Sequence, residues 1–323
     1  MKRYAIVLAA GKGSRMKSKR DDISKVSMPI LGVPVVQYIL DALKPIGCEK
    51  VISVIGYGGK TSEPIVKKES DVVWQKEQKG SGHAVMMASP ILAGLEGETI
   101  VCCGDTPLLR TETLDAMFRF HEDNKSDLTV MSFIPENPFG YGRIVKDKEG
   151  RFLRIVEQKD ASEEEKKIKE VNSGVYIFNN KELFESLDKI TTKNAAGEYY
   201  LTDVIDIFVK KGLRALSYVA SDPTETMGIN DRIQLANAAK VLQLRINKEH
   251  MLAGVSIDDP SNTYISPYAR IGADTIIHPN TFIYGASVIG ENAELGPNSF
   301  LEDVNVKENE IITCRRMVGT KIE

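Results

Sequence analysis

Apolar residues in the first two thirds of the chain alternate between two patterns, which predict strands and helices in turn. Residues 4–10 form a continuous apolar run that ends in a glycine-rich turn, as is typical of a buried parallel strand. Aliphatic residues at helical spacing over 35–43 predict a helix that follows it. Further strands are expected at 50–55, 71–74, 99–103 and 128–133, and further helices at 83–93 and 114–121. This alternation predicts an α/β fold with a Rossmann-like, mixed but mostly parallel sheet and helices on both faces.

The pattern changes after residue 140, where an insertion is expected. Residues 142–146, 152–157 and 171–178 have the composition of strands, and a charged helix is predicted between them at 162–169. Ser162 and Glu165 have the spacing of a capping box for that helix. A long amphipathic helix is expected over 231–252, where it would link two domains.

A six-residue repeat follows the long helix. Aliphatic residues recur at Ile265, Ile271, Ile277, Ile283, Ile289, Leu295 and Leu301. A small residue follows each after four positions, at Ala269, Thr275, Thr281, Ser287, Ala293, Ser299 and Asn305. This period predicts a left-handed parallel β-helix, and it argues against the alternative of short strands in a β-sandwich. Three hexads make one coil, so the repeat predicts about two coils that end near Val306, followed by a tail.

Composition narrows the class of protein. The chain has 323 residues, and 42 basic against 45 acidic side chains give a formal net charge of −3. This balance predicts neither a nucleic-acid partner nor a membrane partner. No apolar run reaches 18 residues, and the N-terminal run leads into Gly-Lys-Gly instead of a signal-peptide cleavage site. Four sparse cysteines predict reduced thiols and a cytoplasmic location, and no cysteine or histidine spacing indicates zinc.

The segment LAAGKGSRM carries the first chemical signal, directly after the first strand. Gly11 and Gly13 let the backbone approach a phosphate chain, and their exposed N–H groups can form an anion cradle. Lys12, Arg15 and the later Lys25 add positive charge for a triphosphate. The spacing matches neither a Rossmann fingerprint nor a Walker A loop. A plain glycine-rich turn is the alternative.

The order of motifs along the chain resembles a known family. LAAGKGSRM, Lys25, Gln75 with GSGHA, CGD, GYGR, VEQKDA, NSGV, GEYYLTD and GIND occur as in N-acetylglucosamine-1-phosphate uridylyltransferases. The resemblance covers about residues 3–255, and the hexad repeat also fits the bacterial bifunctional family. It implies a Mg²⁺-dependent enzyme that converts UTP and N-acetylglucosamine 1-phosphate to UDP-N-acetylglucosamine and pyrophosphate. It also implies a nucleotidyltransferase domain at 1–228, a linking helix at 229–254, and a short β-helix with a tail at 255–323.

The resemblance assigns roles to individual residues. Nucleotide binding falls to Leu8, Ala9, Ala10, Gly11, Gln75, Gly80, Ser81, Cys103 and Gly104. Arg15 and Lys25 are the implied catalytic residues, because they would bind phosphates and stabilise the transition state. Gly142, Glu157 and Asn172 would bind the sugar. Asp105 and Asn230 would hold Mg²⁺, a hard cation that prefers oxygen ligands.

Structural roles compete with these assignments. Asp105 could cap a turn, Asn230 could be a helix N-cap, and Glu157 could be a solvated surface acid. His83 is interpreted as a structural histidine, and Cys102 with Cys103 as core thiols. The sequence also departs from the family pattern, since Ser14 replaces a common Thr, Ser24 a common Pro, and Cys103 a common Tyr.

Alternative functions stay open at this stage. The enzyme could act on another sugar 1-phosphate, such as glucose 1-phosphate, or the chain could be a non-catalytic subunit that binds a sugar nucleotide. A homotrimer is expected, because the flat faces of a β-helix are best buried against copies of itself. Acetyltransferase activity is not expected, since the only histidine of the repeat, His278, lies near its start. Arg315, Arg316 and Lys321 of the tail could bind an anion, but Arg cannot act as a base.

Overall fold

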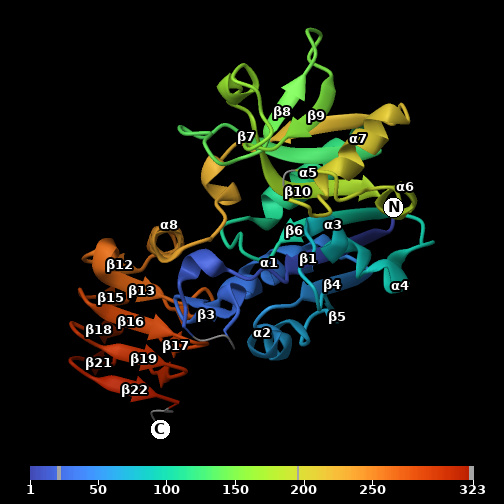
Figure 1. Cartoon of the computed structure of the whole chain (residues 1–323). Coiled ribbons are helices and arrows are strands. Elements are labelled where there is room, and N and C mark those ends of the chain that lie inside the picture. The colour runs from blue at the N-terminus through green and yellow to red at the C-terminus, as the bar shows by residue number, and fades with distance from the viewer. Residues whose placement is uncertain (20–22, 195, 320–323) are drawn as a thin grey trace. The chain divides into compact units, whose positions relative to one another are not determined.

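The computed structural model describes residues 1–19, 23–194 and 196–319, which form two compact units (Figure 1). The first unit contains Met1–Met28 and Val35–Asp231. The second contains Pro29–Pro34 and the described chain from Arg232 onward. Lys321, one of the tail residues considered above, lies outside the described residues. None of the described helices is long and apolar enough to cross a membrane.

A nine-stranded sheet forms the centre of the first unit. Its main path runs β11-β7-β10-β6-β1-β4-β5, and β8 and β9 form a hairpin that pairs with β10. The strands are β1 (Arg3–Ala9), β4 (Lys50–Ile55), β5 (Asp71–Trp74), β6 (Glu98–Cys103), β7 (Leu128–Phe133), β8 (Arg143–Lys146), β9 (Phe152–Val156), β10 (Val171–Asn179) and β11 (Ala215–Val219). On the main path β10 is antiparallel to both of its neighbours, and the other neighbouring pairs are parallel. The predicted mixed, mostly parallel sheet is therefore confirmed.

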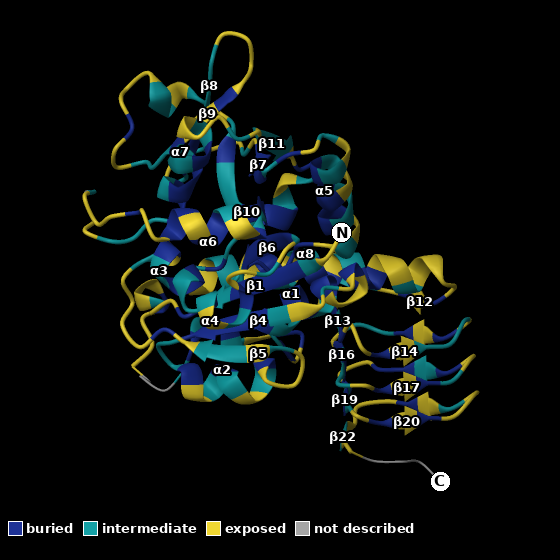
Figure 2. Cartoon of the chain, turned by 90° about the vertical axis from the view of Figure 1, so that its right-hand side faces the viewer, coloured by how far each residue is buried: buried dark blue, intermediate teal, exposed yellow. Residues whose placement is uncertain are grey.

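Helices cover both faces of this sheet, and β1 shows why. Its side chains alternate, so that Tyr4 and Ile6 pack with α3, α4, α6 and α7 while Ala5 and Val7 pack with α1, α2 and α5. The central strands are buried along most of their length (Figure 2). The helices are α1 (Val35–Leu43), α2 (Gly59–Val66), α3 (Ser81–Met86), α4 (Ser89–Leu92), α5 (Thr111–Asp123), α6 (Asn180–Leu187) and α7 (Thr202–Lys210). Short 3₁₀ turns are η1 (Ser14–Met16), η2 (Lys25–Ser27), η3 (Lys44–Ile46), η4 (Glu165–Lys167) and η5 (Pro223–Thr226).

Two helix predictions are wrong in extent. The single helix expected over 83–93 is divided into α3 and α4, and Pro90 stands in the first turn of α4, where it needs no N–H partner. The helix expected over 162–169 is only η4. Its predicted capping box is present nonetheless, because the Ser162 amide donates to Glu165 Oε2 (2.8 Å) and the Glu165 amide donates to Ser162 Oγ (3.3 Å).

The second unit is a β-helix with one helix and one hairpin. Parallel strands stack in three sheets with the orders β12-β15-β18-β21, β13-β16-β19-β22 and β14-β17-β20, which confirms the predicted left-handed β-helix. Its strands are β12 (Ser256–Ile257), β13 (Thr263–Ile265), β14 (Arg270–Ile271), β15 (Ile276–Ile277), β16 (Thr281–Tyr284), β17 (Val288–Ile289), β18 (Glu294–Leu295), β19 (Phe300–Glu302), β20 (Asn305–Val306), β21 (Ile311–Ile312) and β22 (Arg316–Val318). The other elements of the unit are the hairpin of β2 (Pro29–Ile30) and β3 (Val33–Pro34), η6 (Pro260–Asn262) and α8 (Arg232–Leu252).

The β-helix is longer than its repeat predicts. Val306 follows Leu301 after five positions instead of six, so that Val304 and not Asn305 occupies the buried position of that turn. The hexad spacing breaks at this point, which hid the strands β21 and β22 from the periodicity argument. Ile312 is buried and pairs in register with Leu295, and the coil therefore continues past Val306.

Both added elements of this unit pack on the β-helix. Gln243 of α8 donates to the Thr263 carbonyl (2.7 Å), and Asn247 donates to the same oxygen (2.9 Å). The hairpin lies against β16, where a Cβ at Gly32 would be only 3.4 Å from the ring of Tyr284. Gly32 has φ +81°, which also favours glycine.

Candidate active site

A cavity of about 380 Å³ lies at the carboxyl ends of β1 and β6. Its lining residues are Leu8, Ala9, Ala10, Gly11, Lys12, Lys25, Val26, Gln75, Gln78, Gly80, Ser81, Ala84, Cys103, Asp105 and Glu198. Every residue that the resemblance assigned to the nucleotide lines it, with the exception of Gly104. This is the edge of a parallel sheet at which ligands usually bind. We call it the nucleotide cavity.

Strand register places the LAAGKGSRM and CGD motifs next to each other at the ends of β1 and β6. β1 and β6 are parallel neighbours in which Leu8 is opposite Cys103. The Gly104 amide donates to the Leu8 carbonyl (2.9 Å), which joins the two strand ends directly. A Cβ at Gly104 would lie 3.2 Å from the same oxygen. Gly104 therefore allows the close approach that sets Asp105 beside the glycine-rich loop, although it does not line the cavity itself.

A second wall joins the GSGHA and GEYYLTD motifs. Gln75 is buried, and its amide nitrogen lies 3.0 Å from the Gly80 carbonyl and 3.0 Å from His83 Nδ1. The His83 ring stacks on Tyr199 with centroids 6.3 Å apart, which supports a structural role for this histidine. Ser81 Oγ accepts from the Leu201 amide (3.0 Å), so that the two motifs are held side by side.

Gly80→Ala tests this wall. A Cβ at Gly80 would overlap the Tyr199 carbonyl oxygen, and its φ of +108° disfavours an L side chain. We expect a loss of about 2–4 kcal/mol in unfolding free energy. Denaturant unfolding measures the effect. Gly94→Ala is the control, since Gly94 also has positive φ but open space at its Cβ position. Equal destabilisation by both changes would contradict the overlap argument.

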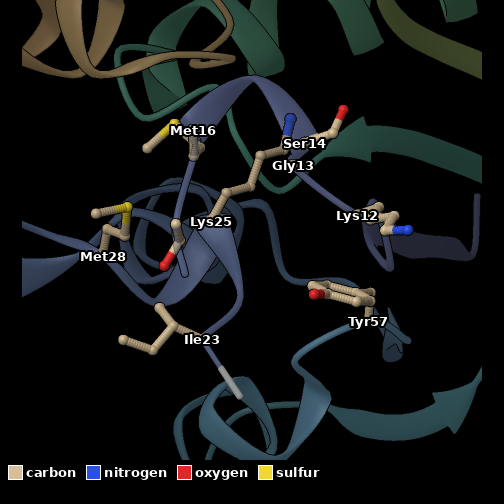
Figure 3. Close-up of a pocket in the computed structure, with 9 residues that line it drawn as sticks. Lys12, Gly13, Ser14, Met16, Ile23, Lys25, Met28 and Tyr57 are labelled. Carbon is tan, nitrogen blue, oxygen red and sulfur yellow. The ribbon is translucent and has the colours of Figure 1, made fainter. Parts of the chain in front are cut away.

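A smaller cavity of about 180 Å³ lies beside the glycine-rich loop (Figure 3). Lys12 and Lys25 line this cavity and the nucleotide cavity alike. The Lys25 side chain runs along Gly13, where a Cβ would lie 3.1 Å from Lys25 Cβ, and the Lys12 ammonium lies 5.7 Å from the Tyr57 ring centre. Two cations next to a bare backbone suit a chain of phosphates.

Arg15 lies outside both cavities. It is exposed on η1, between Gly13 and Lys17, which both have left-handed backbone conformations. Its predicted roles in phosphate binding and catalysis stay predictions.

Three oxygen atoms converge on one ammonium group near Asp105. Lys25 forms an ion pair with the Asp105 carboxylate, and its Nζ lies 3.2 Å from the Ile229 carbonyl and 3.3 Å from Asn230 Oδ1. The Ile229 amide also donates to the Asp105 carbonyl (2.9 Å). The two residues predicted to hold the metal are therefore neighbours, although they are 125 positions apart in the chain.

The donor set fits a divalent cation such as Mg²⁺. The Asp105 carboxylate and Asn230 Oδ1 offer oxygen ligands, which hard cations prefer, and the Lys25 ammonium already occupies a cation position among them. Within the described part of the chain, no group of three or more His, Cys, Asp or Glu side chains is arranged to hold a metal ion. Mg²⁺ takes about six oxygen ligands, so Asp105 and Asn230 would hold it together with oxygen atoms of a substrate.

A third cavity, of about 540 Å³, adjoins the nucleotide cavity through Ser81 and Glu198. Glu157, one of the three predicted sugar-binding residues, lines it. Gly142 is adjacent, since its Cβ position lies 3.5 Å from the Glu157 carboxylate oxygens, and its carbonyl accepts from the Asn172 amide (2.9 Å). The three residues are therefore brought together, although Gly142 and Asn172 are not lining residues. We call this the sugar cavity.

The surroundings raise the pKa of two groups at these cavities, the Glu157 carboxyl and the Cys103 thiol. Burial raises the pKa of Glu157, and the carboxylates of Asp160 and Asp203 raise it further. Burial also raises the pKa of Cys103 to about 12, so that the thiol stays neutral at physiological pH. This supports the interpretation of Cys103 as a packing thiol and not a nucleophile.

Sequence reasoning missed several lining residues. Glu198 and Tyr200 belong to the GEYYLTD motif, which served to identify the resemblance but received no ligand role. Gln78 follows Gln75 in the nucleotide cavity and donates to its carbonyl (3.0 Å). Phe139 lies at the sugar cavity, and no feature of the sequence distinguishes it from other exposed aromatic residues.

Comparisons with known proteins agree with this fold. The nucleotidyl transferase family model matches residues 4–224, and the bacterial transferase hexapeptide (six repeats) model matches residues 261–303. Two solved structures of UDP-glucose pyrophosphorylase, one complexed with UDP-glucose and one apo, cover 76% of this chain and 100% of their own. Their TM-scores are 0.59 and 0.62 at 21% and 20% identity, and this likeness supports the fold alone.

Closer relatives define the family further. A bifunctional protein GlmU of Geobacillus sp. (strain WCH70) is 48% identical over 94% of this chain and 65% of its own length. One from Bacillus velezensis (strain DSM 23117 / BGSC 10A6 / LMG 26770 / FZB42) is 43% identical over 96% of this chain and 68% of its own. The chain belongs to the nucleotidyl transferase family and, within it, to the GlmU family, and it spans about two thirds of the length of these relatives. The resemblance stated from the sequence is thereby confirmed.

Proposed function

We propose that this chain catalyses Mg²⁺-dependent uridylyl transfer, in which UTP and N-acetylglucosamine 1-phosphate give UDP-N-acetylglucosamine and pyrophosphate. The observation that carries the proposal is the group of Lys25, Asp105 and Asn230 at a nucleotide cavity that adjoins the sugar cavity. Membership of the family supports use of a divalent metal ion in general, and the oxygen ligands support Mg²⁺ in particular.

The chain's own residues would act by position and charge. The backbone from Leu8 to Gly11, with Gln75, Gly80 and Ser81, would hold the uridine, while Lys12 and Lys25 would bind the phosphates. A sugar phosphate is already an anionic nucleophile at neutral pH, so that no general base is needed. When bound, the metal ion would neutralise phosphate charge between Asp105 and Asn230.

A panel of substrates tests the proposal. Pyrophosphate release is measured with UTP and a series of sugar 1-phosphates, and N-acetylglucosamine 1-phosphate is expected to be the best of them. Faster release with glucose 1-phosphate would favour the alternative substrate. Absence of release with every sugar, together with retained UTP binding, would favour a non-catalytic subunit. The retained ion pair between Lys25 and Asp105 argues against that last alternative.

Glu157→Gln tests the sugar cavity. We expect the KM for the sugar phosphate to rise about tenfold with little change in the KM for UTP, because hydrogen bonds from sugar hydroxyls to a carboxylate are stronger than those to an amide. The raised pKa of Glu157 adds a pH effect. As pH falls through that pKa, the carboxylate is protonated and sugar binding weakens.

The variant also separates this pH effect from titration of the substrate phosphate. Steady-state kinetics between pH 5 and 8 should show an acid limb in the sugar KM of the wild type that is smaller in Glu157→Gln. Identical pH profiles for the two proteins would reject Glu157 as the group responsible.

The second unit supports a homotrimer. Ile276, Val288 and Ile311 of the β-helix are exposed by 40%, 44% and 69%, and burying such apolar side chains against other copies would stabilise an assembly. Light scattering at micromolar concentration should give three times the chain mass, and a monomer at every concentration would reject the proposal.

The four cysteines, all in the described residues, form no disulfide, which supports a cytoplasmic location.

A further inference from the structure

Two segments carry the proposed metal-binding side chains, and they are joined at a second point. Asp105 follows β6, and Arg110 comes five residues later, directly before α5. Asn230 follows η5, and Glu225 comes five residues earlier, within η5. Arg110 and Glu225 are in direct contact. The two segments therefore meet once at the proposed metal site and once again at this pair.

The contact is extensive for a single ion pair. Arg110 donates from its backbone amide to Glu225 Oε2 (3.2 Å) and from Nε to Glu225 Oε1 (2.7 Å), and its Nη2 also pairs with Oε1. Asp222 lies 3.6 Å from the same Nη2. The Glu225 side chain is only 1% exposed, whereas that of Arg110 is 44% exposed.

General stability is a poor explanation for this arrangement. Burying a carboxylate costs so much desolvation free energy that an apolar side chain of similar volume often gives an equally stable fold. A planar guanidinium that donates to a fixed carboxylate defines geometry in a way that apolar packing does not. The pair therefore suits a role in holding the two segments at one separation.

We propose that Arg110 and Glu225 are a positioning pair that sets the distance between Asp105 and Asn230, and thereby the affinity of the site for its metal ion. Arg110 and Glu225 line none of the three cavities described above, and the pair is not catalytic. This inference rests on the proposed function, because it needs Asp105 and Asn230 to be the metal-binding residues.

Metal dependence is the readout that a merely structural role would not move. Glu225→Gln keeps the shape of the side chain and loses its charge, and Arg110→Lys keeps the positive charge and loses the planar fork. We expect the Mg²⁺ concentration for half-maximal pyrophosphate release to rise about 10–100-fold in Glu225→Gln and less in Arg110→Lys. The KM for the sugar phosphate at saturating Mg²⁺ should stay within about twofold of the wild type.

Glu122→Gln is the matched control. Glu122 of α5 also accepts from an arginine, since Arg3 Nη2 lies 3.0 Å from its Oε1, and it lies outside the cavities described above. Like Glu225→Gln, the Glu122→Gln change removes one negative charge from the first unit. The Mg²⁺ concentration for half-maximal pyrophosphate release (the Mg²⁺ midpoint) should equal that of the wild type. Thermal unfolding of all three variants shows how much each change affects the fold.

Binding of Mn²⁺ in the presence of UTP, followed by electron paramagnetic resonance without any sugar, gives a second readout. Weaker Mn²⁺ binding in Glu225→Gln than in Glu122→Gln, at similar thermal stability, supports the positioning role. A Mg²⁺ midpoint and Mn²⁺ affinity within twofold of the control would overturn it. If the wild type is inactive but its Mn²⁺ binding still depends on Glu225, the proposed function is rejected and the positioning role of the pair is retained.

Discussion

Asp105→Ala should abolish measurable turnover while the fold survives. The change removes one of the two side chains proposed to hold the metal, and it leaves the Lys25 ammonium without its ion-pair partner. The metal would then be held mainly by substrate phosphates. Pyrophosphate release over a Mg²⁺ titration measures the effect, and circular dichroism checks that the fold persists.

Asp105→Asn refines this experiment. Asparagine keeps the size of the side chain and one oxygen ligand but loses the charge, so that we expect weak turnover that recovers in part at high Mg²⁺. Near-normal activity of Asp105→Ala at low Mg²⁺ would exclude Asp105 from the metal site. Equal loss in both variants with no response to Mg²⁺ would indicate a different role for the carboxylate.

Arg15→Ala should lower kcat by about 10²–10⁴ with little change in the KM for UTP. A charge that acts mainly on the developing phosphate charge of the transition state affects rate and not ground-state binding. In this structure Arg15 is exposed and lines neither the nucleotide cavity nor the smaller cavity beside the glycine-rich loop. A large fall in kcat is therefore a demanding test of its predicted role. Steady-state kinetics with UTP and the sugar phosphate provide the measurement.

Lys17→Ala is the control for this prediction. Lys17 is an exposed cation two residues further along the same turn, and it also lines neither cavity. We expect its removal to change kcat by less than about threefold, in line with the small effect of a screened surface charge. A change in UTP affinity alone for Arg15→Ala would make Arg15 a binding residue, and equal effects of both substitutions would point to net charge.

Much of the fold follows from two periodicities that the sequence displays openly. The continuous apolar run at 4–10 predicts β1 within one residue at each end, because a strand buried on both faces leaves no polar position. The hexads predict the inward residues of the β-helix up to Leu301, which are buried except for the half-buried Ile271. Both patterns are local, and each comes from a burial requirement that repeats along the chain.

Features that depend on distant partners were beyond this reasoning. No local pattern shows that β10 runs antiparallel between β6 and β7, because pairing direction depends on the path of the chain. The pair of Arg110 and Glu225 joins residues 115 positions apart, and each looks like an ordinary surface charge in the sequence. Of the candidate site, the motifs identify most lining residues of the nucleotide cavity, while their roles stay predictions.

The hairpin of β2 and β3 belongs to the second unit, although in the sequence it lies between two segments of the first unit. Its residues are synthesised near the start of the chain, but Tyr284, against which Gly32 packs, follows about 250 residues later. Lys25 lies only four residues before this hairpin. Contacts between such distant positions form slowly, because a long loop must close first. During folding, the segment that follows Lys25 therefore reaches its final packing only after β16 has been synthesised and placed in the β-helix.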